Sequence, residues 1–267
     1  MKGEKKALCA SYVNGLLNQG DCPWRIRIVD TIPSTNTALR ELAESGGEEG
    51  EVLVALHQSA GKGSAGRSFY SPADTGLYFS ILLRPTFAPS DAGYLTPAAA
   101  VAVARVLEAA SGEAVQIKWV NDVYAGGRKI CGILTEAALS PNVSSFRYVV
   151  IGIGINLTSP EGGFPEELRS IAGTLFCETC PDRNILLANV LKELYTLYTA
   201  LPSHDFMEEY RARSCLIGRK ACVMTGDTVT EGRVETIDDA GSLVLRDGAG
   251  MLHTFRSGTV RWKGDES

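Results

Sequence analysis

Residues 61–67, Gly-Lys-Gly-Ser-Ala-Gly-Arg, have the composition of a phosphate-binding loop. They follow a β-type run at 51–56 and spell G-x-G-x-x-G, but a dinucleotide-binding loop opens a helix that holds the pyrophosphate. Residues 67–72, Arg-Ser-Phe-Tyr-Ser-Pro, predict a loop instead. A P-loop is excluded because Lys62 is not followed by Ser or Thr. We predict a flexible loop that binds phosphate through backbone N–H groups, Lys62 and Arg67, with an ordinary surface loop as the alternative.

A second set of reactive side chains lies in residues 118–132. A predicted strand ends in Asn121-Asp122, which exposes an amide and a carboxylate at a sheet edge, where ligands tend to bind. Lys129 begins the next predicted strand, and Gly132 allows close approach to its backbone. Two lysines, an aspartate and an asparagine within twelve residues indicate a binding site for a charged ligand, and structural salt bridges are the alternative.

Three shorter patterns are more ambiguous. Residues 34–36, Ser-Thr-Asn, line a pocket or simply cap a helix, and taken alone the cap is favoured. Gly152 and Gly154 weaken an otherwise apolar strand, which makes sense if a flat ligand presses on its backbone. Cys177 and Cys180 form a C-x-x-C pair, but no second pair or nearby histidines complete a zinc site, so we interpret the spacing as chance.

The composition narrows the class of protein. The 267 residues include 45% hydrophobic and 21% charged residues, which is ordinary for a globular chain. A net charge of −5 argues against broad nucleic-acid binding, and no apolar run is long enough to span a bilayer. The N-terminal residues lack the apolar core of a signal peptide. Seven scattered cysteines, an odd count, predict a reducing cytoplasm.

The periodicity of apolar residues predicts a mixed α/β fold followed by a small β module. Helices are expected at 4–18, 34–46, 96–112, 182–201 and 206–214, and strands at 24–29, 51–56, 76–84, 115–120, 129–138 and 147–157. After residue 214, short alternating strands at 220–225, 228–238, 242–246 and 251–256 predict a five-stranded barrel-like module. We therefore expect a helical segment over 1–23, a main domain over 24–214 and a small domain over 215–267.

Five motifs stand in order along the chain. They are Ser-Thr-Asn, a basic glycine loop ending in Gly-Arg with Ser-Pro shortly after, Lys-Trp-x-Asn-Asp, Arg-Lys-x-x-Gly-Ile-Leu and Gly-x-Gly-x-Asn. In this order and spacing the chain resembles the biotin–protein ligases over roughly residues 24–263. The resemblance implies a mixed-sheet catalytic domain, related to lipoate–protein ligases, and an SH3-like C-terminal barrel. Too few residues precede the first strand for a helix-turn-helix, so the monofunctional type without a DNA-binding domain is expected.

The resemblance also implies a reaction. Biotin and ATP form biotinyl-5′-AMP and pyrophosphate, with Mg²⁺, and biotin then passes to a lysine of a biotin carboxyl carrier domain of a carboxylase. It implies no DNA or membrane partner, and a monomer or homodimer. A lipoate or octanoate ligase on the same fold is one alternative, although the motif at residues 118–122 argues against it. A non-catalytic homologue that binds biotin is another, with its only support in Ser64.

Roles follow by motif position. Lys129 would contact the biotin carboxylate and the α-phosphate, Asp122 would help to hold Mg²⁺, and Lys118 would neutralise pyrophosphate as the third catalytic residue. Phe69 is the candidate platform for adenine. The biotin pocket would comprise Ser34, Thr35, Asn36, Gln58, Lys62, Gly63, Ser64, Lys129, Gly132 and Gly154. The nucleotide would contact Gly61, Arg67, Phe69, Asn121, Asn156 and Arg183.

One departure from the family pattern bears on function. The family usually reads Gly-Arg-Gly-Arg-x-Gly-Arg in the loop, whereas this chain has Lys62 and Ser64 at the first two arginine positions. The second arginine clamps the adenylate phosphate in the family, and loss of such a charged hydrogen bond costs on the order of 2 kcal/mol, over tenfold in retention. We hypothesise that the adenylate is held loosely or that another cation is recruited. Val120, where the family usually has Pro, is a milder departure.

Overall fold

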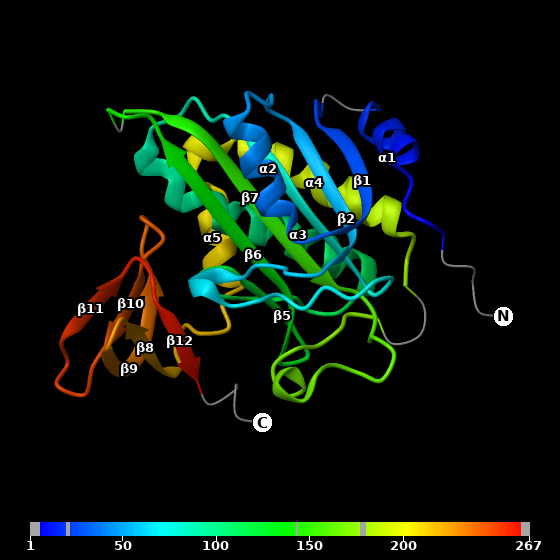
Figure 1. Cartoon of the computed structure of the whole chain (residues 1–267). Helices are drawn as coiled ribbons and strands as arrows, with labels where there is room; N and C mark the ends of the chain where they lie inside the picture. Colours follow the sequence, from blue (N-terminus) through cyan, green and yellow to red (C-terminus); the bar gives the residue numbers. More distant parts are fainter. Residues whose placement is uncertain (1–5, 20–21, 143, 177–179, 263–267) are drawn as a thin grey trace.

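The computed structural model describes residues 6–19, 22–142, 144–176 and 180–262, and its largest element is a seven-stranded sheet (Figure 1). The strand order is β1-β2-β3-β7-β6-β5-β4. β1 and β2 pair in parallel and all other neighbours pair antiparallel, so the predicted mixed sheet is confirmed. The strands are β1 (Arg25–Ile32), β2 (Glu51–Gln58), β3 (Gly76–Leu83), β4 (Gln116–Lys118), β5 (Asp122–Ala125), β6 (Arg128–Leu139) and β7 (Phe146–Asn156).

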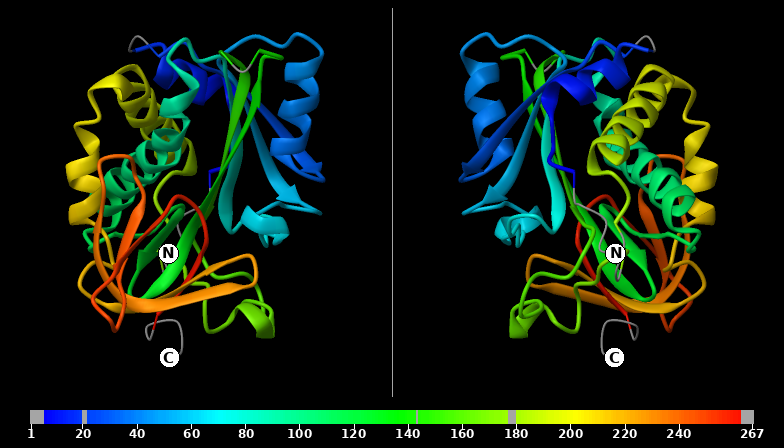
Figure 2. Two further views of the ribbon diagram at one scale, coloured as in Figure 1. Left: turned by 90° about the vertical axis from the view of Figure 1, so that its left-hand side faces the viewer. Right: turned by 90° about the vertical axis from the view of Figure 1, so that its right-hand side faces the viewer.

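Helices cover both faces of this sheet (Figure 2). α3, α4 and α5 pack together on one face, and α2 covers β2, β3 and β7 on the other. α3 is rich in alanine and buries ten residues, because the small side chains let it approach α4 and the sheet closely. The helices are α1 (Ala10–Leu17), α2 (Thr35–Glu44), α3 (Leu95–Ser111), α4 (Arg183–Thr199) and α5 (Phe206–Ala212).

Several predicted boundaries are wrong in detail. α1 starts at Ala10, so the described part of the predicted helix is shorter than expected. α3 starts at Leu95, which makes Pro97 its third residue; proline is still tolerated because N–H groups of the first turn have no helical partner. The strand expected at 115–120 ends at Lys118, and a turn leads from there into β5, which was not predicted as a separate strand. The peptide bond between Trp119 and Val120 is cis.

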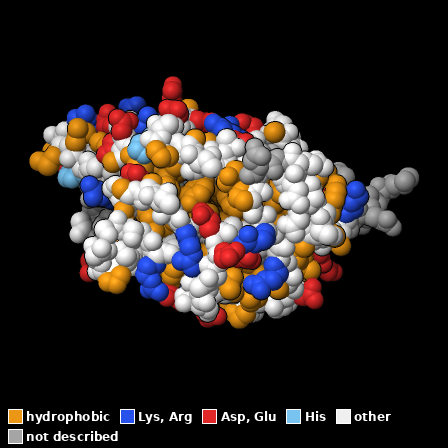
Figure 3. Space-filling model, turned by 90° about the horizontal axis from the view of Figure 1, so that it is seen from above, with side chains coloured by type: hydrophobic (Ala, Val, Ile, Leu, Met, Phe, Trp, Pro, Cys, Tyr) orange, Lys and Arg blue, Asp and Glu red, His pale blue; other side chains and the backbone are white. Residues whose placement is uncertain are grey.

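The surface and the helices agree with the composition. Within the described ranges no helix combines the length and apolar character needed to cross a bilayer. On the face seen in Figure 3, acidic and basic side chains are interspersed with apolar ones.

The C-terminal part forms a separate five-stranded antiparallel sheet in the order β11-β10-β9-β8-β12. Its interior holds Val223, Val234, Leu243, Leu245 and Val260, which alternate with exposed residues along the strands, as expected for a sheet with one buried face. The predicted small SH3-like β domain is confirmed as a fold, and its fifth strand follows the predicted four. The strands are β8 (Lys220–Thr225), β9 (Thr228–Ile237), β10 (Leu243–Arg246), β11 (Leu252–Phe255) and β12 (Thr259–Trp262).

The segment between α5 and β8 joins the large sheet. The N–H of Ile117 donates to the carbonyl of Arg213 (2.8 Å), and the N–H of Cys215 donates to the carbonyl of Ile117 (3.0 Å). This parallel pairing attaches the connecting segment to β4, at the end of the sheet that carries the 118–122 motif. The small domain is therefore connected to the site through backbone hydrogen bonds.

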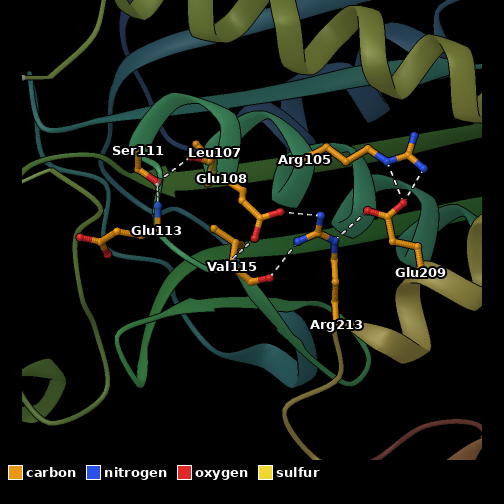
Figure 4. A network of polar contacts seen from close by, with 8 residues as sticks. All are labelled: Arg105, Leu107, Glu108, Ser111, Glu113, Val115, Glu209 and Arg213. Atoms are coloured by element: carbon orange, nitrogen blue, oxygen red, sulfur yellow. Dashed lines mark hydrogen bonds and ion pairs between the residues drawn. The ribbon is translucent and has the colours of Figure 1, made fainter.

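A network of ion pairs anchors this connection (Figure 4). The guanidinium of Arg213 donates to Glu108 (2.8 Å), to Glu209 (2.8 Å) and to the carbonyl of Val115 (3.1 Å). Arg105 donates to the same Glu209 carboxylate. Hydrogen bonding from Arg213 lowers the pKa of Glu108, and at Glu209 burial raises the pKa but the two arginines outweigh it, so that its pKa is also lowered.

Two further hydrogen bonds hold the small domain against the large one. The indole N–H of Trp119 donates to the carbonyl of Gly241 (2.8 Å), and the Tyr94 hydroxyl donates to the carbonyl of Asp239 (2.7 Å). Both acceptors lie in the turn between β9 and β10. Trp119 belongs to the Lys-Trp-x-Asn-Asp motif, so the motif contacts the small domain directly.

Replacement of Arg213 by Met should lower the free energy of unfolding by about 2 kcal/mol at neutral pH, because two carboxylates lose charged hydrogen bonds. Both carboxylates have a lowered pKa in the folded state, so their contribution is present above the ordinary value of 4.5 and is lost as the pH falls through the lowered pKa. Urea denaturation as a function of pH should show the difference between the two proteins shrinking below pH 4.5.

The matched control is Arg246→Met, which breaks the more exposed pair with Glu235 and should cost less than about 1 kcal/mol. Equal losses in the two variants, or a difference that does not change in acid, would contradict this account.

Candidate active site

A polar pocket, here called the first pocket, lies where the N-terminus of α2, the end of β2 and the middle of β6 and β7 meet. All ten residues that the sequence assigns to a biotin pocket line it, so the fold brings four distant motifs together. The lining residues are Ser34, Thr35, Asn36, Gln58, Lys62, Gly63, Ser64, Phe69, Phe79, Asn121, Lys129, Gly132, Ile133, Leu134, Gly152, Ile153 and Gly154.

Strand register explains the glycines of β7. One row across the sheet contains Ser80, Gly152 and Leu134, and the next contains Tyr78, Gly154 and Gly132. Because alternate residues face the same side, these two rows lie next to each other on the α2 side of the sheet. A side chain from outside the sheet packs on each row.

Asn36 and Phe69 are those side chains. A Cβ atom on Gly152 would lie 1.9 Å from Asn36 Oδ1, and one on Gly154 would lie 2.4 Å from Phe69 Cε1. A Cβ atom on Gly132 would lie 3.0 Å from Phe69 Cε2. The expectation that a flat ligand presses on the backbone at Gly152 and Gly154 therefore needs correction, since in this structure Asn36 and the ring of Phe69 occupy that space. The requirement for glycine at these positions is set by protein side chains.

Ser34 serves both roles that the sequence left open. Its side-chain oxygen accepts from the backbone N–H of Thr37 (3.4 Å), which caps α2, and the same residue lines the first pocket. The cap places the first turn of α2 against the sheet, which buries Thr35 and Asn36. The cap and the pocket are consequences of one local structure.

A hydrogen-bonded network lies under the first pocket. The side-chain carbonyl oxygen of Gln58 accepts a hydrogen bond from the backbone N–H of Thr35 (2.9 Å). The same oxygen lies 3.1 Å from the hydroxyl oxygen of Thr35. Gln58 donates from Nε2 to the hydroxyl of Ser71 (3.0 Å), which donates to the carbonyl of Phe69 (3.1 Å). Ser80 links Thr35 to Asn36. Ser71 and Ser80 were not predicted from the sequence, although Ser80 is recognisable as the polar residue in the buried run of β3.

The loop at 61–67 contains no α-helix, which confirms that it is not a dinucleotide fingerprint. It makes a single 3-10 turn over Ser64–Gly66, with Ala65 at φ 55° and Gly66 at φ 74°. The Arg67 guanidinium donates to the backbone carbonyl of Ser64 (3.1 Å) and to its hydroxyl (2.8 Å). The serine at the variant position thus binds the remaining arginine of the loop.

A second, wider pocket adjoins the first and shares Gly63, Ser64, Phe69 and Lys129 with it. Between the two, the Lys129 ammonium lies 2.6 Å from Asp122 Oδ1. Pairing of Lys118 with Asp122 and of Asp122 with Gly132 brings the two reactive runs at 118–122 and 128–132 together through β5, the strand that was not predicted. The other lining residues are Arg67, Ser68, Tyr70, Lys118, Asp122, Tyr124, Asn156, Phe164, Leu168, Ser170, Ile171, Ala172, Thr259, Val260, Arg261 and Trp262.

Comparison with known proteins gives a consistent result. Residues 28–156 match the model of the biotin/lipoate A/B protein ligase family, and residues 220–261 match that of the biotin protein ligase C-terminal domain. The chain is 35% identical to a biotin–[acetyl-CoA-carboxylase] ligase of Mycobacterium tuberculosis over 248 residues, 89% of each chain. The chain belongs to the biotin protein ligase family.

Other members of the biotin protein ligase family are similar to this chain in sequence and in fold. A bifunctional ligase/repressor of Bacillus subtilis is 33% identical over 231 residues, which are 85% of this chain and 70% of that protein. The solved structure of a biotin protein ligase from Aquifex aeolicus in complex with biotin and ATP is 26% identical, with a TM-score of 0.74 over 89% of this chain and 99% of that one. The arrangement of both domains is therefore shared with a solved ligase.

Three residues that the sequence assigns to the nucleotide do not line the second pocket of this ligase. Arg183, the first residue of α4, is buried, ion-paired with Asp74 (3.3 Å), and lines neither pocket. Gly61 also lines neither pocket. Its backbone packs against that of Phe69, where an added Cβ atom would lie 2.4 Å from the carbonyl oxygen of Phe69. Asn121 lines the first pocket and not the second, and its amide donates to the carbonyl of Ile133 (2.8 Å), which fixes the β5–β6 turn.

The small domain supplies part of the second pocket. Residues 259–262 of β12 line it, and so does the loop that follows β7. These residues were not predicted to belong to a site, because the sequence of a short strand does not indicate that it will face a site on another domain. Cys177 of the C-x-x-C pair lies outside the described residues, so its interpretation stays a prediction.

The side chains that line the second pocket indicate which metal ion they could bind. In the described part of the chain no cluster of three or more His, Cys, Asp or Glu residues could hold a metal. Asp122 is the one acid among the residues that line the second pocket. A single carboxylate fits Mg²⁺, which commonly binds one or two carboxylates together with substrate phosphates.

Gly154→Ala should displace the Phe69 ring, since a Cβ at 2.4 Å from an aromatic carbon cannot be accommodated in place. We expect a loss of about 1–3 kcal/mol in unfolding free energy, measured by urea denaturation. Gly248→Ala is the control, because a Cβ there meets no atom within 4 Å. A Gly154→Ala variant as stable as this control would contradict the role of Phe69.

Proposed function

We propose that this ligase forms biotinyl-5′-AMP from biotin and ATP and then transfers biotin to a lysine of a biotin carboxyl carrier domain. The observation that supports this most strongly is the position of Lys129. Its side chain lines both the smaller polar pocket and the wider basic one, and its ammonium lies beside a carboxylate 2.6 Å away. An acid bound in the first pocket and a triphosphate in the second would meet at this lysine.

The first pocket suits the ureido group of biotin, which has two N–H donors and a carbonyl acceptor. Ser34 and Gln58 present hydroxyl and amide groups that bind such a ring. Lys129 at the far end would pair with the biotin carboxylate and orient it toward phosphorus. The apolar ring of Phe69 would cover the hydrocarbon part of the ligand.

The second pocket suits the nucleotide. Lys118 is 8% exposed, with its ammonium 5.6 Å from the centre of the Tyr124 ring, and Arg67 lies on the loop side. These cations would neutralise the phosphates, and Asp122 would hold Mg²⁺, which neutralises charge on the leaving pyrophosphate. Attack of the biotin carboxylate on the α-phosphorus forms the acyl–phosphate bond and releases pyrophosphate.

The second step needs no nucleophile from the enzyme. The carrier lysine, as a neutral amine, attacks the biotinyl carbonyl, and AMP leaves with the electron pair of the broken bond. The two adjoining pockets would keep water from the anhydride until the carrier arrives. We further propose a cytoplasmic monomer or homodimer that needs neither DNA nor a membrane.

A biotin-dependent ATP–pyrophosphate exchange assay tests the proposal. Wild type should exchange with biotin and not with lipoate or octanoate, and Lys129→Met should lose about 10²–10³-fold in rate because the charge at phosphorus is no longer stabilised. Lys192→Met, on α4 outside both pockets, is the control. Exchange with lipoate would favour the lipoate alternative, and biotin binding without exchange would favour a non-catalytic binder.

Ser64→Arg tests how the intermediate is held. An arginine there should slow release of biotinyl-5′-AMP by more than about tenfold, because it adds a charged hydrogen bond to the phosphate. Filter-binding of labelled adenylate measures the release rate. Ser59→Arg, exposed and outside both pockets, adds the same charge nearby and should leave release unchanged. Equal release rates for wild type and Ser64→Arg would contradict the hypothesis that the adenylate is held loosely because this arginine is missing.

A further inference from the structure

We propose that Glu136 is a positioning residue that sets the direction of the hydrogen bonds under the first pocket and thereby its selectivity for a ligand with N–H donors. This inference rests on the proposed function, since it concerns recognition of the biotin ring. Glu136 lies on β6, outside both pockets, with its side chain 27% exposed. α2 lies over this part of the sheet (Figure 1).

The Glu136 carboxylate fixes the orientation of the Asn36 amide. Oε2 accepts from Asn36 Nδ2 (3.0 Å), and Oε1 accepts from Arg40 (2.9 Å). An ionised carboxylate only accepts hydrogen bonds, so Asn36 must turn its NH₂ group toward Glu136, where it also donates to the carbonyl of Leu134 (3.3 Å). The Asn36 carbonyl oxygen consequently points inward, toward Ser80.

The orientation of Asn36 determines which hydroxyl donates. The Ser80 hydroxyl donates its single hydrogen to Asn36 Oδ1 (2.5 Å). At the contact between Ser80 and Thr35 (2.7 Å), Thr35 must therefore be the donor. With its hydrogen directed to Ser80, Thr35 contributes only its backbone N–H to the Gln58 carbonyl (2.9 Å). The Gln58 carbonyl then accepts one hydrogen bond from Thr35 instead of two.

The opposite direction would also satisfy Ser80, Thr35 and Gln58. A flipped Asn36 would donate to Ser80, Ser80 would donate to Thr35, and the Thr35 hydroxyl would donate to Gln58 Oε1, 3.1 Å away. The Gln58 carbonyl would then carry two hydrogen bonds from Thr35. The flipped arrangement places the Asn36 oxygen against the Glu136 carboxylate and the carbonyl of Leu134, so these two acceptors select the observed direction. Of the two, only the Glu136 carboxylate can be changed by a side-chain substitution.

Glu136→Gln weakens this preference with little change of shape, because the new amide can donate to a flipped Asn36 oxygen. We expect KM for biotin to rise about three- to tenfold while KM for ATP stays within about twofold. Wild type should discriminate against the two cyclic carbamate analogues of biotin, in each of which one ureido N–H is replaced by oxygen. In Glu136→Gln this discrimination should shrink for the analogue that lacks the N–H facing Gln58. The readout is the exchange assay with each acid.

Ser80→Ala gives an independent test from inside the network. Without Ser80, the Thr35 hydroxyl can donate only to Gln58, so this variant should show the same reduced discrimination as Glu136→Gln. The double variant should be no worse than either single one, because both break the same chain. Glu136→Asp, which keeps an acceptor-only group, should restore part of the discrimination.

Two controls separate positioning from general damage. Glu44→Gln alters a carboxylate that accepts hydrogen bonds from Tyr148 and Arg147 and not from Asn36. Arg40→Met removes the other hydrogen-bond partner of Glu136. Both variants should discriminate between biotin and the analogues as wild type does. Unchanged discrimination in Glu136→Gln and Ser80→Ala would overturn the inference, as would equal increases in KM for biotin and ATP. A wild type without biotin-dependent exchange would instead overturn the proposed function.

Discussion

Close packing of Asn36 and Phe69 against the backbone of β7 is the constraint on which the site depends. Both side chains need the space left by missing Cβ atoms, at Gly152 and Gly154. Asn36 brings the N-terminus of α2 onto the sheet, and Phe69 brings the glycine loop onto it. The first pocket exists because these two segments are held a fixed distance apart on adjacent rows of one sheet face.

The second pocket depends on a different kind of contact. Lys118 and Asp122 are held by the short β4–β5 hairpin at the edge of the sheet, and a short edge hairpin is weak by itself. The connecting segment pairs with β4, and Arg213 ties that segment to α3 and α5. The small domain then completes the pocket with β12. The geometry of the second pocket therefore depends on the pairing of the connecting segment between α5 and β8 with β4.

Much of the fold could be predicted because local patterns were strong. The apolar run of β7, the Ser34 cap and the alanine-rich α3 each follow from nearest-neighbour chemistry. Boundaries were less predictable: β4 ends at Lys118 and α3 starts before Pro97, since pairing partners and turns decide where an element stops. Arg183 shows the same limit for the site, because an arginine at a helix start was expected near the nucleotide and is instead buried against Asp74.

The sequence by itself determined the family, the order of the motifs and ten of the seventeen residues that line the first pocket, because each motif is a short run with a characteristic spacing. Only the tertiary structure decided what those residues touch. It showed that Phe69 fills the space above two glycines, that Arg67 binds Ser64, and that Glu136 reaches the pocket through Asn36. The physical reason is that strand register and helix docking set which groups lie within 3 Å of each other, and hydrogen bonds have a direction only once both partners are in place.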